Sequence, residues 1–233
     1  MKIKAIVFDK DGTLFSFSDT WSAWANRFFT DLSAGDLAKA SELGALVGYD
    51  FERGEFARDS VVIAGTPVEI ALALAPGLPD RTQMDLVRQM NEIAEEAPAA
   101  EAAPLVPLLS ELLARGLKLG VATNDAESPA RANLSSFGVE GMFDFIAGSD
   151  SGYGFKPEPG MLLAFSGAVG VPAASCVMVG DSTHDLRAGA AAGMRTVAVL
   201  TGMAGPSDLA PYADIVLPDI GHIPAWLDEI EQL

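Results

Sequence analysis

Two carboxylates stand one residue apart, directly after the first apolar segment of the chain, residues 3–8. The sequence IVFDKDGTL places Asp9 and Asp11 there, with Lys10 between them. In extended backbone, residues two apart share a face, so we expect both carboxylates to point the same way and Lys10 to point away. Such a pair suits a hard divalent cation, or acid–base work when mutual repulsion raises one pKa.

Polar side chains follow two later apolar segments in the same manner. They are Thr123 and Asn124 after residues 117–122, and Asp181 and Asp185 after residues 176–179. Lys156, in the phrase GYGFKPEPG, is a further candidate. Any one of these residues alone could be a turn residue, a helix cap or a solvated lysine. Their combination favours one shared site, because ligands of open α/β sheets bind beyond the carboxyl ends of the strands.

Short apolar runs, rich in β-branched residues, predict buried parallel strands. They cover residues 3–8, 117–122, 143–147, 176–179, 196–200 and 215–217. Helical patterns lie between them, at residues 106–116, 128–138, 159–170 and 183–194. This alternation of strands and helices predicts an α/β fold with a doubly wound parallel sheet.

Residues 18–100 break the alternation and contain no convincing strand pattern. Their amphipathic patterns predict helices inserted between the first strand and the rest of the sheet. The Ala-, Pro- and Glu-rich stretch at 95–104 is the expected returning linker. We therefore expect a core domain made of residues 1–17 and 101–233, and an all-α cap domain at residues 18–100.

The expected cap carries an aromatic stripe and scattered arginines. The aromatic residues are Trp21, Trp24, Phe28 and Phe29, and the arginines are Arg27, Arg53 and Arg58. Aromatic residues at helical spacing predict a packed cap core rather than ligand contacts. The arginines are expected to be solvated, although each could meet a second anionic group on a ligand.

The polar motifs, taken together and in order, resemble those of the haloacid dehalogenase-like hydrolase superfamily. They are Asp9-Lys10-Asp11-Gly12-Thr13, then Thr123 in GVATND, Lys156 in FKPEPG, and Gly180 to Asp185 in VGDSTHD. The resemblance spans residues 1–217 and implies a Rossmann-like core. The insertion after the first motif looks like the family's helical cap type. The phrases KPEP and VMVGDSTHDLRAGAAAGM look most like the phosphoglycolate phosphatase-like branch, although Lys10 replaces a more usual apolar residue.

The resemblance implies a Mg²⁺ site, since Mg²⁺ prefers oxygen ligands and lets a carboxylate approach a phosphate dianion. Asp9 and Asp181 would each give a carboxylate oxygen, and Asp11 its backbone carbonyl. Asp185 would act from the second shell, through water.

The same resemblance implies that Asp9 attacks phosphorus and forms an aspartyl phosphate. Asp11 would protonate the leaving alcohol and then take a proton from water. Thr123, with backbone N–H groups around Gly12 and Asn124, would hold the phosphoryl oxygens. Lys156 would offset negative charge. The expected activity is hydrolysis of a small phosphate monoester, with phosphoglycolate as the leading substrate.

Other functions stay open at this stage. A phosphomutase such as a β-phosphoglucomutase-like enzyme would use the same core residues, and the fold also permits a non-catalytic phospho-ligand binding or interaction module. A phosphonatase needs a cap lysine, and Lys39 is the one lysine between residues 16 and 100. A dehalogenase is disfavoured because that branch lacks the second aspartate, whereas Asp11 is present.

The net charge of the chain disfavours some classes of binding partner. The formal charge of −17 disfavours nucleic acid and anionic membranes, so we expect a small phosphorylated metabolite as the partner. The single cysteine, Cys176, predicts a buried inert thiol. No apolar run is long enough for a membrane span, and the first is too short for a signal peptide, so a cytoplasmic protein is expected, as a monomer or homodimer.

Overall fold

A six-stranded parallel sheet forms the centre of the larger lobe in the computed structural model, which describes residues 2–231. The strand order is β5-β4-β1-β6-β7-β8, and every neighbouring pair is parallel. The strands are β1 (Ala5–Phe8), β4 (Lys118–Ala122), β5 (Phe145–Ala147), β6 (Cys176–Gly180), β7 (Arg195–Val199) and β8 (Ile215–Leu217). All six expected strands are confirmed, with ends displaced by up to two residues.

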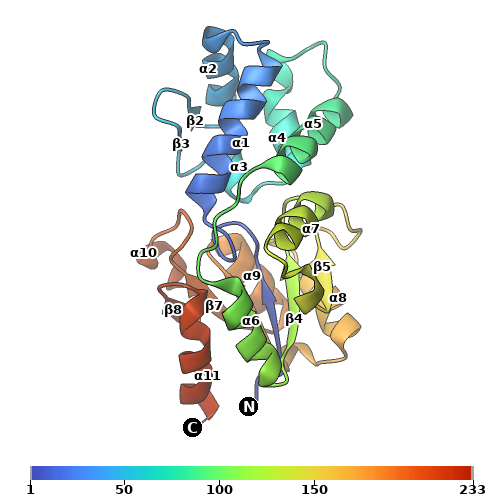
Figure 1. Cartoon of the computed structure of the whole chain (residues 1–233), viewed down its shortest axis with the longest axis vertical. Coiled ribbons are helices and arrows are strands. Elements are labelled where there is room, and N and C mark those ends of the chain that lie inside the picture. The colour runs from blue at the N-terminus through green and yellow to red at the C-terminus, as the bar shows by residue number, and fades with distance from the viewer. Residues whose placement is uncertain (1, 232–233) are drawn as a thin grey trace.

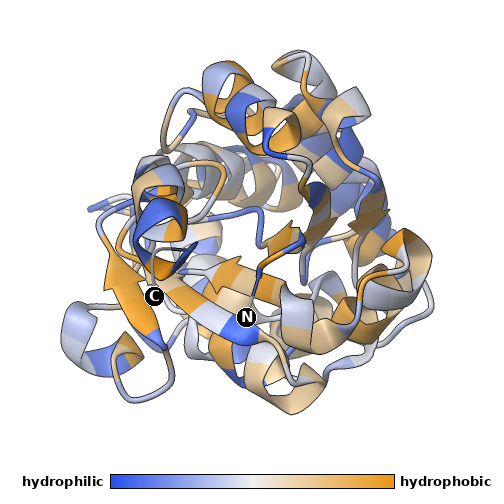
Figure 2. Cartoon of the chain, turned by 90° about the horizontal axis from the view of Figure 1, so that it is seen from below, coloured by the Kyte–Doolittle hydropathy of each residue, from blue (hydrophilic) through white to orange (hydrophobic). Residues whose placement is uncertain are grey.

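The alternation of side chains along β1 explains the two helical layers. Ile6 and Phe8 pack into the cluster that contains α6 (Leu105–Ala114), α7 (Glu127–Ser136) and α11 (Ile223–Glu231). Ala5 and Val7 point to the opposite face, against α8 (Gly160–Val169) and α9 (Thr183–Ala192). Both faces of the sheet are therefore covered, as the doubly wound prediction requires, and Figure 2 shows the largely hydrophobic strands surrounded by helices of mixed hydropathy.

The smaller lobe is built from residues inserted after β1 (Figure 1). Its helices are α1 (Phe17–Leu32), α2 (Leu37–Leu46), α3 (Val61–Ala64), α4 (Pro67–Leu74) and α5 (Gln83–Glu96). Trp21, Trp24, Phe28 and Phe29 are all buried in the hydrophobic cluster of this lobe. The prediction that the aromatic stripe packs in the core of the cap is therefore confirmed, although Trp21 also lines the pocket described below.

The cap also contains a small hairpin that the sequence analysis did not predict. Strands β2 (Tyr49–Asp50) and β3 (Glu55–Phe56) pair antiparallel, so the expectation of an all-α insertion is wrong in this detail. Two-residue strands are too short to show a period of two in the sequence, which explains why the pattern analysis missed them.

The two chain crossings between core and cap run side by side. Ser16 N donates to Ala100 O at 2.8 Å, and Ala102 N donates to Leu14 O at 3.0 Å. The cap is thus attached through one paired segment, and both chain ends lie at the far end of the core (Figure 1).

The remaining elements are short. They are α10 (Pro206–Leu209) and four 3₁₀ turns, η1 (Ala75–Gly77), η2 (Glu140–Met142), η3 (Ala173–Ser175) and η4 (Ile220–His222). Within residues 2–231, no helix has the length and hydropathy needed to span a membrane.

Candidate active site

The carboxyl ends of the three central strands bring the candidate residues together. Phe8, the last residue of β1, is in register with Val121 of β4 on one side and with Val179 of β6 on the other. The residues that follow therefore emerge next to one another, and Asp9, Thr123 and Asp181 all line one pocket between core and cap. The expectation that separate strands deliver these side chains to one edge is confirmed.

A lysine lies between two carboxylates at the floor of this pocket. Lys156 Nζ donates to Asp9 Oδ1 at 2.5 Å and to Asp185 Oδ1 at 2.6 Å. One carboxylate oxygen from each of Asp9, Asp181 and Asp185 lies within 4.8 Å of the other two. All four side chains are buried, so this cluster is an ionic centre in a region of low dielectric.

Burial makes the ionised form of these acids costly. It raises the pKa of Asp9 to about 7, although the Lys156 ammonium opposes the rise. Burial, together with the negative charges of Asp9 and Asp185, also raises the pKa of Asp181 well above its ordinary value. A divalent cation would favour the ionised carboxylates. The oxygen-only donor set and its spacing fit such a hard cation.

Local sequence features hold the acids in place. Thr13 Oγ1 donates to Asp181 Oδ1 at 3.1 Å. Gly12 has a φ of +79°, and a Cβ there would lie 2.4 Å from Asp181 Oδ2, so no other residue fits beside this carboxylate. In the first turn of α9, Asp185 Oδ2 accepts hydrogen bonds from the backbone N–H and the hydroxyl of Ser182 in a reciprocal cap.

Two residues expected to hold the phosphoryl group have partly structural roles. Asn124 exchanges two 2.8 Å hydrogen bonds with the backbone of Lys156 and also donates to Ala64 O of the cap. The N–H of Gly12 already donates to Phe15 O at 2.7 Å. The contribution of Gly12 that the structure shows is the absence of a side chain, which leaves room for the Asp181 carboxylate. The roles of Thr123 and Asn124 toward a ligand stay predictions.

Lys10 lies where the sequence analysis did not place it. Its Nζ donates to Asp125 Oδ2 at 2.6 Å and to Asn133 Oδ1 at 3.2 Å, and lies 3.1 Å from Asp11 Oδ2. The expectation that Lys10 points away from Asp11 is therefore wrong. The chain turns at this point, because the carbonyl oxygen of Lys10 accepts from the amides four and five residues later, and the period of two applies only to extended backbone.

This ion pair sets the electrostatics of Asp11. Burial alone would lower the pKa of Lys10, but Asp11 and Asp125 raise it, and the net shift is upward. Burial raises the pKa of Asp11, against the opposing charge of Lys10. Asp11 Oδ1 is buried and receives no hydrogen bond from any residue in the described part of the chain. The indole N–H of Trp21 also lowers the pKa of this carboxyl, while Lys10 holds it through Oδ2.

Replacing Lys10 should be strongly destabilising. Lys10→Met leaves Asp11 and Asp125 buried without their cation, and removal of one partner of a buried ion pair costs about 3–5 kcal/mol. The free energy of unfolding, measured by denaturant titration, should fall by this amount. The matched control is Lys118→Met, which removes a half-exposed lysine paired with Asp144 and should cost less than about 1 kcal/mol. Equal losses in both variants would contradict the role given to Lys10.

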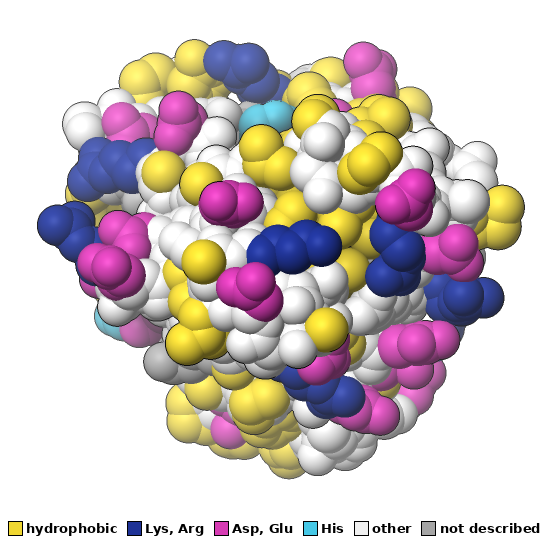
Figure 3. All heavy atoms as spheres, turned by 90° about the horizontal axis from the view of Figure 1, so that it is seen from above, with side chains coloured by type: hydrophobic (Ala, Val, Ile, Leu, Met, Phe, Trp, Pro, Cys, Tyr) yellow, Lys and Arg dark blue, Asp and Glu magenta, His cyan; other side chains and the backbone are white. Residues whose placement is uncertain are grey.

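The cap closes the pocket with apolar side chains. The free space in the pocket is small, about 40 Å³. The three cap arginines do not line it. Arg27 pairs with Glu96 at 2.8 Å and Arg53 with Asp50 at 3.7 Å, in keeping with the mixed charges on the outer face of the cap in Figure 3.

Comparisons with known proteins agree with this geometry. A family model described as haloacid dehalogenase-like hydrolase matches residues 3–193. The chain belongs to this family. The hydrolase is 32% identical over 227 residues to a phosphoglycolate phosphatase of Rhodospirillum rubrum, covering 96% of this chain and 90% of that protein. It is 33% identical over 205 residues to the probable phosphatase IndB of Dickeya dadantii, covering 85% and 81%.

A solved structure shares the complete fold of the hydrolase. A predicted phosphoglycolate phosphatase from Haemophilus somnus 129PT superposes with a TM-score of 0.75 at 21% identity, covering 97% of this chain and 98% of that one. The family resemblance read from the four motifs is therefore confirmed, as is the expectation of an enzyme of the hydrolase class.

The structure also places Lys39, His184 and Cys176. Lys39 is exposed near the start of α2 and does not line the pocket of this hydrolase, so it is not placed to form a Schiff base there. His184 is the second residue of α9 and lines the pocket. Cys176 is buried, and burial raises the pKa of its thiol to about 11, which agrees with an inert side chain.

Proposed function

We propose that this hydrolase is a Mg²⁺-dependent phosphatase that cleaves a small phosphate monoester through an aspartyl phosphate on Asp9. The observation that carries the proposal is the buried cluster of Asp9, Asp181, Asp185 and Lys156 at the carboxyl edge of the sheet. Carboxylates converging with one lysine suit the binding and transfer of a phosphoryl group.

The carboxylates of Asp9 and Asp181 and the backbone carbonyl of Asp11 would hold Mg²⁺. Both carboxylate oxygens of Asp185 already accept hydrogen bonds, from Lys156 and from Ser182, which supports a role for Asp185 through water. When bound, the metal neutralises charge and reduces the repulsion between Asp9 and the phosphate dianion.

The chain's own residues would carry the transfer in two steps. A carboxylate oxygen of Asp9 forms a bond to phosphorus while the bond to the alcohol oxygen breaks, and Asp11 gives its proton to that oxygen. Water then attacks phosphorus, Asp11 takes the proton, and the bond to Asp9 breaks to release inorganic phosphate. Thr123 and Lys156 would stabilise the equatorial oxygens, while residues 18–100 act as the cap that excludes bulk water.

Phosphate release from a panel of monoesters tests the proposal. Phosphoglycolate heads the panel, because two relatives are named phosphoglycolate phosphatases. Phosphate esters of uncharged alkyl alcohols, hexose phosphates and nucleoside monophosphates follow. Turnover should require Mg²⁺, stop with chelator, and return when Mg²⁺ is restored in excess. Activity unaffected by chelator would contradict the metal role. Isomerisation of a sugar phosphate without release would instead mean a phosphomutase.

A further inference from the structure

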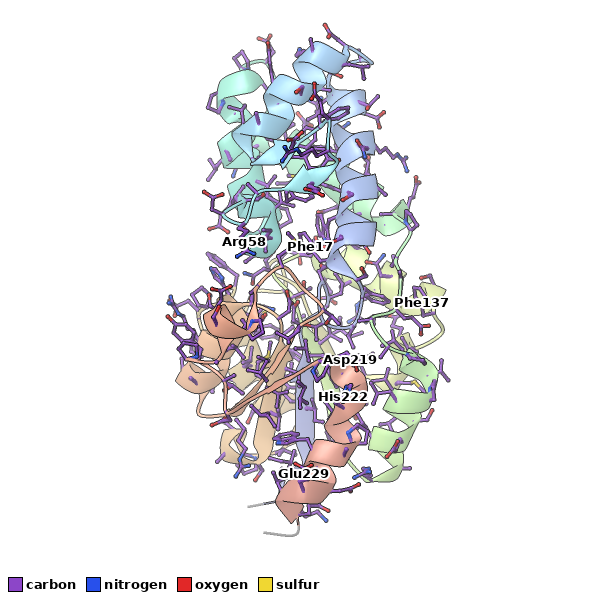
Figure 4. The ribbon with its side chains drawn as sticks, turned by 90° about the vertical axis from the view of Figure 1, so that its left-hand side faces the viewer. Phe17, Arg58, Phe137, Asp219, His222 and Glu229 are labelled. Atoms are coloured by element: carbon purple, nitrogen blue, oxygen red, sulfur yellow. The ribbon has the colours of Figure 1, made fainter. Side chains whose placement is uncertain are left out.

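The cap side of the active-site pocket is an apolar wall. Its side chains are Phe17, Trp21, Val62, Ile63, Pro67 and Ile70. Figure 4 shows Phe17 at the junction between cap and core. We call this set the cap wall. It faces the acids of the core, so it is the surface that the leaving alcohol of a phosphate ester must contact.

The lysine in the pocket lining is already paired with two aspartates. Five aspartates line the pocket, and among the residues that the structure describes Lys156 is the one lysine or arginine that does so. The Nζ of Lys156 is held by Asp9 and Asp185 at 2.5 and 2.6 Å. His184 is the one other basic side chain in the lining, and it stands on the core side at the start of α9. Arg58 lies exposed at the lower edge of the cap (Figure 4), outside the lining.

A second anionic group on the substrate would therefore be poorly accommodated. It would lose its hydration against the cap wall without gaining a cation, and a buried unpaired charge is costly. An uncharged alcohol, in contrast, would gain stability by burying its carbon atoms against Ile63 and Trp21.

We propose that the cap wall selects phosphate esters whose leaving group is a small, uncharged and largely apolar alcohol. The inference rests on the phosphatase activity proposed above and adds its substrate class, which departs from the expectation that phosphoglycolate is the leading substrate. The little free space in the pocket, about 40 Å³, favours a small alcohol over a bulky one, and the wall residues are its specificity determinants.

A pair of esters of similar length tests the selection. The ratio of kcat/KM for n-propyl phosphate to that for phosphoglycolate should exceed about tenfold, the discrimination expected from one unpaired group in an apolar pocket. Higher kcat/KM for phosphoglycolate would overturn the inference while leaving the phosphatase activity intact. No release from any ester of the full panel would overturn the activity, and the inference with it.

A charge placed in the cap wall should reverse the preference. Ile63→Lys puts a cation opposite the core acids and should shift the ratio toward phosphoglycolate by about tenfold or more. Leu72→Lys is the matched control, because Leu72 is 58% exposed on the same lobe and does not line the pocket. That variant should keep the wild-type ratio. If Ile63→Lys fails to fold, Ala64→Lys introduces the charge at a half-buried neighbour that also lines the pocket. An unchanged ratio in a folded wall variant would contradict the assignment.

Discussion

Asp9→Asn is expected to lower kcat by about a thousandfold or more, because an amide oxygen cannot replace the carboxylate as nucleophile. The fold should survive the change. The amide would keep an oxygen that accepts from Lys156, and the raised pKa of Asp9, about 7, shows that burying its charge is costly. Removing that charge should leave the melting temperature equal or higher. Phosphate release and thermal unfolding, measured on the same preparation, check both statements.

Asp80→Asn provides the matched control for this variant, since Asp80 is exposed on the cap and lies outside the pocket. It should retain wild-type kcat. Turnover near the wild-type rate in Asp9→Asn would show that another group attacks phosphorus, whereas loss of activity with loss of the folded state would leave the chemical role of Asp9 without support.

Lys156→Met is expected to lower kcat by about a hundredfold or more, because one preorganised charge of this kind contributes that much to stabilising a transition state. The ammonium is buried and bonded to both Asp9 and Asp185, so its loss leaves these carboxylates close together without a cation. We expect a lower melting temperature as well.

A measurement of Mg²⁺ affinity distinguishes a direct role of Lys156 in catalysis from a loss of metal binding in the variant. The cluster becomes more negative in Lys156→Met, so Mg²⁺ binding, measured by calorimetry on the folded variant, should not weaken. Unchanged kcat, or a loss of activity that high Mg²⁺ concentration fully restores, would contradict a direct role of Lys156 in the transfer.

The sheet and the main site residues could be predicted because both follow from local patterns. Each strand of the sheet is a short apolar run, and parallel strands bring their carboxyl ends to one edge. This is why Asp9, Thr123 and Asp181 could be grouped from the amino-acid sequence alone. Lys156 lies in a loop rather than after a strand, so the sheet pattern did not place it, and its role in the site came from the resemblance to the family.

The contacts of Lys10 could not be predicted in this way. Its partners Asp125 and Asn133 stand 115 and 123 residues away, and no local pattern signals such a pair. The periodicity argument failed because the chain leaves the extended conformation as soon as β1 ends. A lysine between two aspartates in a segment that must be buried was a signal, since lysine is almost never buried without a partner.

The residues of the cap wall could not be predicted from the sequence either. Helical periodicity identified the apolar face of α1, but it could not show that Phe17 and Trp21 also reach the pocket, or that the loop and helix at 61–70 complete the wall. The same packing leaves Arg27 and Arg53 paired on the outer surface. The proposal for the leaving group therefore required the folded arrangement.

The most direct test of the central claim is detection of the phosphorylated enzyme during turnover. A rapid-mixing reaction with the best ester and Mg²⁺, quenched in acid and digested, should give a phosphorylated peptide that contains Asp9, with fragment ions that place the group on Asp9 and not on Asp11. The modification should appear before steady-state phosphate release and be absent from Asp9→Asn. Phosphate release with no phosphoenzyme at any time, or phosphorylation of another residue, would contradict the account.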